Sequence, residues 1–451
     1  MQLCTVVARL LAFLSTLSLL SLVSADARIP LRSKDGNGKI APKVFIISMF
    51  APEAEAWWGI PEFDLLAHNI SLPGLSPIFP HVHCTADHAV CQLITGESEI
   101  NAATTVSAVA FSDRFDLRQT YFLIAGIAGI NPEVATTGSV TFARFAVQVA
   151  LQYEFDSREI PANYSTGYIP LGAYAPGQYP RSIYGTEVFE VNNDLRSLAA
   201  SFARTANLSD SPAAQAYRAK YVTPTNRLYA AGAAPPSVVE CDIATSDVYY
   251  SGNILSTAFG NTIRLLTNGT GVYCTTAQED NATLEALLRA AVHKRADFAR
   301  IIVMRTASDF DRPYPGEDPM YNLLYADQGG FQPAVDNIYR AGIKVVEGIL
   351  QGWNQTFAAG VKPSNYIGDI FGTLGGTPDF GPGRTVALTE GGALLQKRGM
   401  VRRKGRYVRI TVLHAGNILS QLLDDQLIDV PATADWIDGF LQESVRAWHA
   451  L

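Results

Sequence analysis

Short runs of apolar residues recur along the chain and alternate with segments of helical periodicity. Residues 43–48 and 120–125 are almost continuously apolar, which is typical of parallel strands covered on both faces. Residues 101–111 and 282–293 place apolar side chains at helical spacing. Further strand-like runs lie at 90–94, 138–142, 145–149, 238–243 and 300–304. The alternation predicts an α/β fold with a mostly parallel sheet flanked by helices.

Shifts in composition predict how the chain is divided. We expect a linker at 26–42, one α/β domain over 43–383, and a C-terminal extension over 384–451 that changes character. Within the domain, residues 154–236 are rich in Pro, Gly, Tyr and Ala. We interpret this stretch as an insertion or cap over the sheet, helical in part at 193–203.

The first 25 residues have the pattern of an export signal. Arg9 precedes an apolar run at 10–23, and the small residues Ser24 and Ala25 follow it. This order predicts a secretory signal peptide at 1–25. A single membrane anchor is the alternative, but the apolar run is short for a span. We therefore expect a secreted protein, extracellular or in the cell wall, whose mature chain has no transmembrane span.

The cysteines and the glycosylation sequons agree with export. Four cysteines remain after the signal, an even number, as expected in an oxidising environment: Cys84, Cys91, Cys241 and Cys274. The first two are close enough in sequence to close a small hairpin, and the other two would then pair by elimination. Sequons of the form Asn-X-Ser/Thr, which are candidate glycan sites, occur at Asn69, Asn163, Asn207, Asn268, Asn281 and Asn354.

Charge and metal-ligand spacing exclude other classes of function. The 451-residue chain has a formal net charge of −7, so it lacks the broad basic face that a nucleic-acid binder needs. His81, His83 and His88 lie near Cys84, but their spacing matches no recognised zinc site. We expect neither a metal nor a cofactor.

Loops are expected after four of the predicted strands, at 49–53, 95–98, 126–129 and 305–309. In open α/β sheets, ligands bind at the carboxyl ends of strands, so we expect these segments to converge on one site. Each also has a structural interpretation, because a glycine turn allows close packing and an aspartate after a strand often caps a helix. Their combination in this order is what favours a site.

Several runs resemble a known family. Residues 95–103 (TGESEINAA), 122–129, 184–190, 278–282 and 305–313 are similar to those of fungal proteins grouped as purine nucleoside permeases, and this resemblance covers 43–383. The order of segments over 43–315 distantly resembles the purine nucleoside phosphorylase and nucleosidase superfamily. The resemblance implies a nucleoside phosphorylase-like fold and a purine nucleoside as the small-molecule partner.

The same resemblance implies catalytic roles. Glu53, after the first strand, matches the glutamate with which nucleosidases activate water. Asp309 matches the aspartate that protonates the leaving base, Ser308 helps to hold the purine, and Arg305 matches an arginine three residues before that serine. Cleavage passes through an oxocarbenium-like cation, so a carboxylate near the anomeric carbon and an acid near the base suit the reaction.

Further residues are implied in substrate binding. Glu279 and Gln278 match a pair that binds the ribose hydroxyls, and Tyr249 matches an aromatic residue that stacks on the base. The loops add Thr95, Gly96, Ala128 and Gly129. The alternatives are a surface carboxylate for Glu53, first-turn helix polarity for Glu279, a helix N-cap for Asp309 and a core side chain for Tyr249.

Departures from the family pattern bear on the nucleophile. Ile127 stands where the family usually has Ser or Thr, and Ser98 and Glu99 stand where it has Gly and Lys. No Lys or Arg lies between Lys43 and Arg114, where phosphorylases of this superfamily place phosphate-binding arginines. We therefore favour water over phosphate as the acceptor.

The sequence thus favours a purine nucleosidase in nucleoside salvage over three alternatives. A non-catalytic nucleoside-binding component of uptake is one, because without spanning helices the chain cannot itself form a transmembrane path. A phosphate-dependent phosphorylase and an α/β wall protein without a small ligand are the others. The oligomeric state stays open, a homo-oligomer included.

Overall fold

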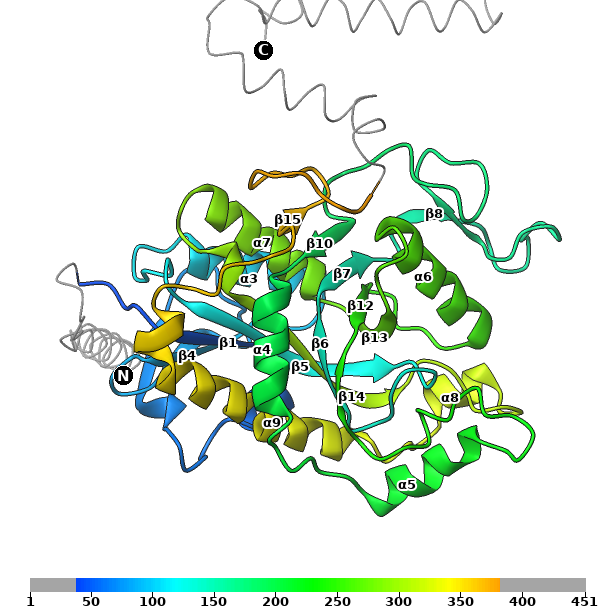
Figure 1. Cartoon of the computed structure of the whole chain (residues 1–451), viewed down its shortest axis with the longest axis horizontal. Helices are drawn as coiled ribbons and strands as arrows, with labels where there is room; N and C mark the ends of the chain where they lie inside the picture. The colour runs from blue at the N-terminus through cyan, green and yellow to red at the C-terminus, as the bar shows by residue number, and fades with distance from the viewer. Residues whose placement is uncertain (1–37, 382–451) are drawn as a thin grey trace, which may run out of the picture. The chain divides into compact units, whose positions relative to one another are not determined.

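The computed structural model describes residues 38–381. The predicted signal peptide and the extension over 384–451 lie outside the described residues, as does most of the linker. The expected α/β class is confirmed, since a large mixed sheet is flanked by helices (Figure 1). Within the described part of the chain, no helix combines the length and apolar character that a membrane crossing needs.

Thirteen strands of residues 38–381 form one sheet, and two more form a separate hairpin. The strands are β1 (Val44–Ser48), β2 (His68–Ser71), β3 (His81–Cys84), β4 (Val90–Ile94), β5 (Tyr121–Ile130), β6 (Val140–Ala143), β7 (Phe145–Gln148), β8 (Gln152–Glu154), β9 (Tyr168–Pro170), β10 (Val188–Glu190), β11 (Val238–Glu240), β12 (Asp242–Thr245), β13 (Tyr273–Ala277), β14 (Ile301–Phe310) and β15 (Gly368–Asp369). The α-helices are α2 (Ala51–Glu55), α3 (Glu99–Ala110), α4 (Asn193–Ala203), α5 (Pro212–Arg218), α6 (Asn253–Leu266), α7 (Asp280–Val292), α8 (Pro319–Leu324) and α9 (Phe331–Gln351).

Parallel strands form the centre of the sheet. β1 pairs in parallel with β4 and β5, and β5 pairs in parallel with β14. Every residue of β1 and β4 is buried, which explains why all their residues but Ser48 and Gln92 are apolar. Antiparallel pairs β2–β3 and β3–β4 extend one edge of the sheet, and β10 pairs with β7 and β15 near the other.

β5 and β14 are longer than the apolar pattern predicts. Residues 126–129 and 305–309 continue the two strands and are not loops, with Arg305 beside Gly126 and Asp309 beside Gly129. Gly126 has no side chain, and this leaves room for Glu53, because a Cβ at position 126 would lie 2.5 Å from Oε1 of Glu53. The N-cap interpretation of Asp309 is therefore wrong, since this residue belongs to a strand. The predicted loop at 49–53 is likewise partly helical, in α2.

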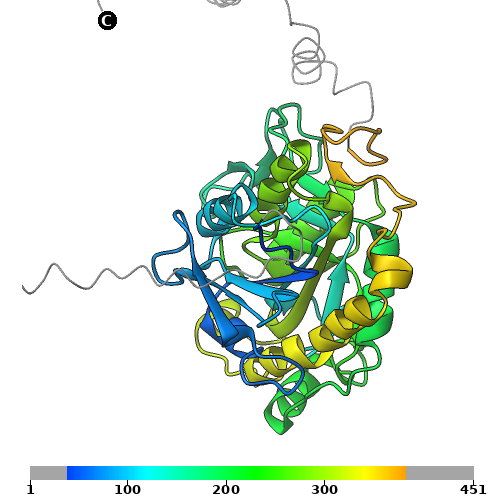
Figure 2. The ribbon, with the colours of Figure 1, turned by 90° about the vertical axis from the view of Figure 1, so that its left-hand side faces the viewer.

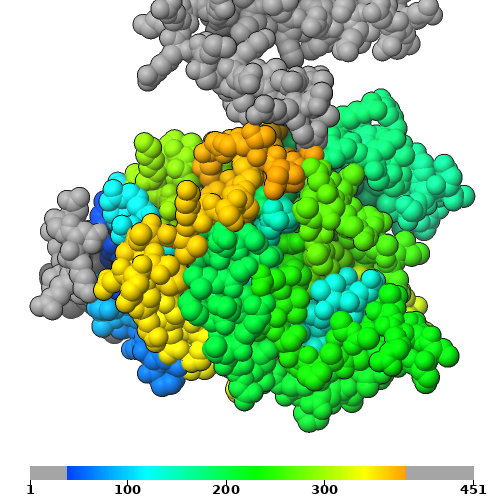
Figure 3. Space-filling view, viewed as in Figure 1, coloured from blue at the N-terminus to red at the C-terminus, as the bar shows by residue number. Residues whose placement is uncertain are grey.

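Helices cover both faces of the central strands. α3 and α7 pack together on one face, where Val106 and Leu287 meet Phe45 and Ile124. α4 and α9 pack together on the other face, against the alternate strand residues such as Ile46. Figure 2 shows this arrangement from the side, and Figure 3 shows the surfaces of α4 and α9 side by side on the face toward the viewer.

The stretch at 154–236 contributes both to the sheet and to its cover. It contains β10, which joins the main sheet, and α4, which occupies the predicted helical range 193–203. It also contains β9, which pairs with β8 outside the main sheet, and α5.

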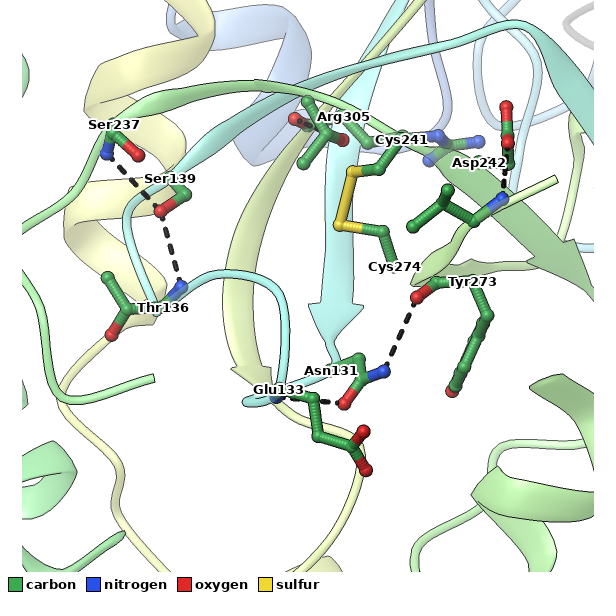
Figure 4. The surroundings of a disulfide bond; sticks show 12 residues. Asn131, Glu133, Thr136, Ser139, Ser237, Cys241, Asp242, Tyr273, Cys274 and Arg305 are labelled. Carbon is green, nitrogen blue, oxygen red and sulfur yellow. Dashed lines mark hydrogen bonds between the residues drawn. A yellow bond between two sulfur atoms is a disulfide. The ribbon is translucent and has the colours of Figure 1, made fainter. Parts of the chain in front are cut away.

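Two disulfides join neighbouring strands. Cys84 in β3 is bonded to Cys91 in β4, which closes the hairpin considered from the sequence. Cys241, next to β12, is bonded to Cys274 in β13 (Figure 4). Both strands of this second pair lead into the candidate site, β12 toward Tyr249 and β13 toward Glu279.

The sequons differ in exposure. Five asparagines are exposed, namely Asn69, Asn163, Asn207, Asn268 and Asn354. The sixth, Asn281, is 3% exposed, and its Nδ2 donates a hydrogen bond to the Thr186 carbonyl oxygen at 2.7 Å. A glycan on Asn281 would break this bond, so the folded protein disfavours glycosylation there.

Candidate active site

A cavity lies where the distal halves of β5 and β14 meet the segments after β1, β4, β12 and β13. It holds about 110 Å³ of space for water-sized molecules. Among the predicted site residues, its walls include Glu53, Ala128, Gly129, Tyr249, Gln278, Glu279, Arg305 and Ser308. The four predicted segments therefore converge, and wall residues that the sequence did not single out include Glu97, Ser246, Tyr250 and Thr276.

Glu53 is a buried carboxyl at the floor of this cavity. Pro52 lies in the first turn of the short helix α2, where its preset backbone angle suits the helix, and Glu53 follows it as a buried residue. Its oxygens accept hydrogen bonds from the backbone N–H groups of Met49 and Ile127, each at 2.7 Å. Burial raises the pKa of Glu53 to about 7, although Arg305 and these two N–H groups act in the opposite direction. Glu53 is thus not a surface carboxylate, and near neutral pH it can accept a proton.

Arg305 is a fully buried cation whose charge is already paired. Its Nη2 lies 2.8 Å from Oδ2 of Asp280 and 3.2 Å from Oε2 of Glu279. Its Nη1 donates to the carbonyl oxygen of Ile127 at 3.1 Å, so the backbone of Ile127 connects it to Glu53. Buried charges require such partners. The departure at Ile127 matters little here, because these contacts use only the backbone.

Asp280 is a site residue that the sequence reasoning missed. It is completely buried at the start of α7 and shares the Arg305 guanidinium with Glu279. Its place directly after Glu279 was visible in the sequence. An acid in the first helical turn is so common, however, that only the contact with Arg305 distinguishes this one.

Glu279 and Asp247 occupy the N-terminus of α3. Oε1 of Glu279 accepts a hydrogen bond from the Ser98 N–H at 3.0 Å. Oδ1 of Asp247 accepts from the Glu99 N–H at 2.9 Å, and its Oδ2 accepts from the Ser98 hydroxyl at 2.9 Å. Burial raises the pKa of Glu279 above its usual range. Helix N-termini often bind anions in proteins, but at the N-terminus of α3 this position is occupied by the protein's own carboxylates.

Asp309 lies beside Ser308 and Tyr249 near the end of β14. Its Oδ1 is 2.5 Å from the Ser308 hydroxyl and 3.3 Å from the Tyr249 hydroxyl. Burial raises the pKa of Asp309 above its usual range, while these hydroxyls act to lower it. Tyr249 is 65% exposed, so it is not a core side chain. Asp309 thus lies next to an aromatic ring that is exposed enough to contact a ligand.

The remaining predicted residues differ in position. Gln278 is in the wall, and its Nε2 donates to the Asp247 carbonyl oxygen at 3.3 Å. Thr95 is fully buried outside the wall, and its hydroxyl donates to the Gly96 carbonyl oxygen at 2.8 Å. Gly96 adopts φ +83°, which favours glycine, and it turns the chain so that Glu97 reaches the wall.

The charge of the cavity is negative. Glu53, Glu97 and Glu279 line it, and Arg305 is the single Lys or Arg among its described walls. Because Arg305 is already paired with Asp280 and Glu279, the cavity offers no unpaired guanidinium to an anion.

These features define an α/β protein with a carboxylate-lined cavity at the carboxyl ends of its central strands. A family model described as "Purine nucleoside permease (NUP)" matches residues 41–362, and the chain belongs to this family. A Candida albicans protein described as a purine nucleoside permease is 45% identical over 345 residues, which cover 75% of this chain and 83% of that protein.

The chain is also similar over part of its length to solved structures of nucleosidase and hydrolase proteins. The 5'-methylthioadenosine/S-adenosylhomocysteine nucleosidase from Neisseria meningitidis is 13% identical, with 68% of this chain and 99% of that chain covered and a TM-score of 0.40. The futalosine hydrolase of Helicobacter pylori is 13% identical, with 68% and 97% covered and a TM-score of 0.40.

Proposed function

We propose that this protein binds purine nucleosides and hydrolyses their N-glycosidic bond. The observation that carries the proposal is the presence of two carboxyl groups with different surroundings, one in the cavity wall and one bonded to the wall residues Ser308 and Tyr249. Glu53 is buried in the floor with a pKa of about 7, and Asp309 lies beside the exposed ring of Tyr249. Environments that differ in this way suit one group to act as base and the other as acid. The purine nucleoside is supported by the family and by the name of the Candida albicans relative.

In the proposed reaction, Tyr249 stacks on the purine and Asp309 gives its proton to the base as the bond from the anomeric carbon to nitrogen breaks. Glu279 accepts hydrogen bonds from the ribose hydroxyls. Glu53 removes a proton from water while the water oxygen forms its bond to the anomeric carbon. The products are the free base and ribose, so atoms and charges balance without a cofactor.

Water is favoured over phosphate because of the charges in the cavity. The backbone N–H groups of Ser98 and Glu99 are already bonded to the carboxylates of Glu279 and Asp247. A phosphate anion would have to displace these carboxylates and would then lie close to Glu53. Arg305 does not offset this repulsion, because its charge is paired.

A non-catalytic role in nucleoside uptake is the second candidate, and the permease name of the relative favours it. In that case the same cavity would capture nucleosides for a separate carrier. Capture outside the cell rests on the export pattern at 1–25, outside the described residues.

The two candidates differ in whether bound nucleoside is consumed. The mature chain should be titrated with inosine and with adenosine by calorimetry, and the same mixtures should then be analysed by chromatography. Binding followed by release of hypoxanthine or adenine supports the hydrolase. Binding without any free base supports the uptake component, and the absence of both contradicts the proposal.

A further inference from the structure

Tyr249 and Tyr250 are consecutive residues of the segment that follows β12. Each is connected by hydrogen bonds to an aspartate at the end of β14. Asp309 contacts the hydroxyl of Tyr249 directly. Two residues further, Asp311 is connected to Tyr250 through Tyr273. The first contact belongs to the proposed catalytic site, whereas the second is buried behind it and has no part in the reaction.

The buried connection has a fixed direction. Asp311 accepts hydrogen bonds from Nε and Nη2 of Arg312 at 2.8 and 3.0 Å. Tyr273 donates to Oδ2 of Asp311 at 2.5 Å, because a carboxylate paired with a guanidinium can only accept. The Tyr273 oxygen must then accept from the Tyr250 hydroxyl, 3.0 Å away. Tyr250 is 8% exposed and lines the cavity, and the Tyr273 oxygen is the hydrogen-bond partner of its hydroxyl.

Tyr273 and Asp311, the middle and one end of the connection, are also held through their backbones. The Tyr273 carbonyl oxygen accepts a hydrogen bond from Nδ2 of Asn131 at 3.3 Å. Figure 4 shows this bond and the disulfide of the adjacent Cys274. The carbonyl oxygen of Asp311 accepts from the Gly252 N–H and from the Ser256 hydroxyl, each at 3.1 Å. The segment that carries Tyr249 and Tyr250 is therefore held to the end of β14 both by its own backbone and through Tyr273.

We propose that Tyr273 is a positioning residue for nucleoside binding, which acts through Asp311 and Tyr250 to hold Tyr249 over the cavity beside Asp309. This inference rests on the proposed binding of purine nucleosides. It assigns Tyr273 to the geometry of the base-binding side and not to proton transfer. Its loss should therefore affect affinity more than turnover.

The test removes single hydroxyl groups. Tyr273→Phe leaves the Tyr250 hydroxyl buried without its acceptor, and Tyr250→Phe removes the donor of the same bond. Tyr121→Phe is the matched control, since Tyr121 is also buried but donates to the Phe357 carbonyl oxygen, and neither residue lines the cavity. The dissociation constant for inosine is measured by calorimetry for each variant and for the Tyr250/Tyr273 double variant, and kcat is measured on the same samples.

We expect Kd to rise on the order of tenfold in each single variant at the pair, with kcat changed less than about threefold. The double variant should bind about as weakly as the weaker single variant, because both changes remove one interaction. Tyr121→Phe should bind like the wild type. Should Tyr273→Phe not fold, Tyr250→Phe decides by the same comparison with the control.

Equal Kd values for Tyr273→Phe and Tyr121→Phe, or full additivity in the double variant, would overturn the inference. A fall in kcat without a change in Kd would also overturn it. A wild type that binds inosine without consuming it refutes hydrolysis but leaves this comparison valid. A wild type that binds no purine nucleoside refutes the proposed function and, with it, the inference.

Discussion

The burial of Glu53 makes the stability of the fold depend on pH, by an amount that can be calculated. The pKa of its carboxyl rises from 4.5 to about 7 on folding. Between these pH values the folded chain holds a proton that the unfolded chain has released. The contribution of this carboxyl to the free energy of unfolding is therefore full below pH 4.5 and is lost as the pH rises through 7.

The magnitude follows from the size of the pKa change. Each pKa unit corresponds to about 1.4 kcal/mol, so the full difference is worth about 3 kcal/mol of unfolding free energy. Glu53→Gln removes this titration, because the amide is neutral at every pH. Between pH 4.5 and 8 the wild type should therefore lose about 3 kcal/mol more stability than the variant.

Urea unfolding of both proteins at pH 4.5 and at pH 8 measures this difference. Other carboxyls with raised pKa values, such as Glu99 and Glu190, titrate in both proteins and cancel. Glu55→Gln, which changes an exposed carboxylate in the same short helix, is the control and should leave the pH dependence unchanged. If Glu53→Gln and the wild type lose equal stability over this range, Glu53 does not carry a raised pKa and its role as a base loses its support.

Three further predictions concern the neighbouring groups. Asp309→Asn should lower kcat on a good purine nucleoside by on the order of 100-fold with little change in Kd, and near wild-type turnover would show that Asp309 is not the acid. Glu279→Gln should raise KM as well, because ribose hydroxyls donate better to a carboxylate than to an amide, and an unchanged KM in steady-state kinetics would refute ribose binding. Asp280→Asn should cost about 3 kcal/mol of unfolding free energy in urea, since it leaves buried Arg305 with one carboxylate partner, and a loss within experimental error would contradict the pairing.

The apolar pattern predicted the central strands but not where they end. β1 and β4 were predicted to within a residue because both are buried on both faces, so nearly every position is apolar. β5 and β14 continue through glycines and polar residues that the pattern assigned to loops. Pairing between β5 and β14 stabilises the extended conformation of these residues, so the sequence of either strand alone does not show where it ends.

Only some residues of the candidate site could be predicted from the sequence. Glu53 and Asp309 could be proposed because each follows a predicted strand, and parallel topology brings such positions to one edge of the sheet. Glu279 could be proposed only from the family resemblance, because strand β13 before it was not predicted. Asp280 could not be predicted, because an acid in the first turn of a helix is common and its partner Arg305 is distant in sequence. Asp247 could not be predicted, because its partner, the N–H of Glu99, is also distant in sequence.

The most direct test of the central claim is the dependence of base release on phosphate. The purified mature chain is incubated with inosine in phosphate-free buffer and in the same buffer with added inorganic phosphate, and hypoxanthine and the sugar product are quantified over time. If water is the acceptor, hypoxanthine and free ribose form at the same initial rate in both buffers. Hypoxanthine that forms only with phosphate, together with ribose 1-phosphate, would contradict this claim.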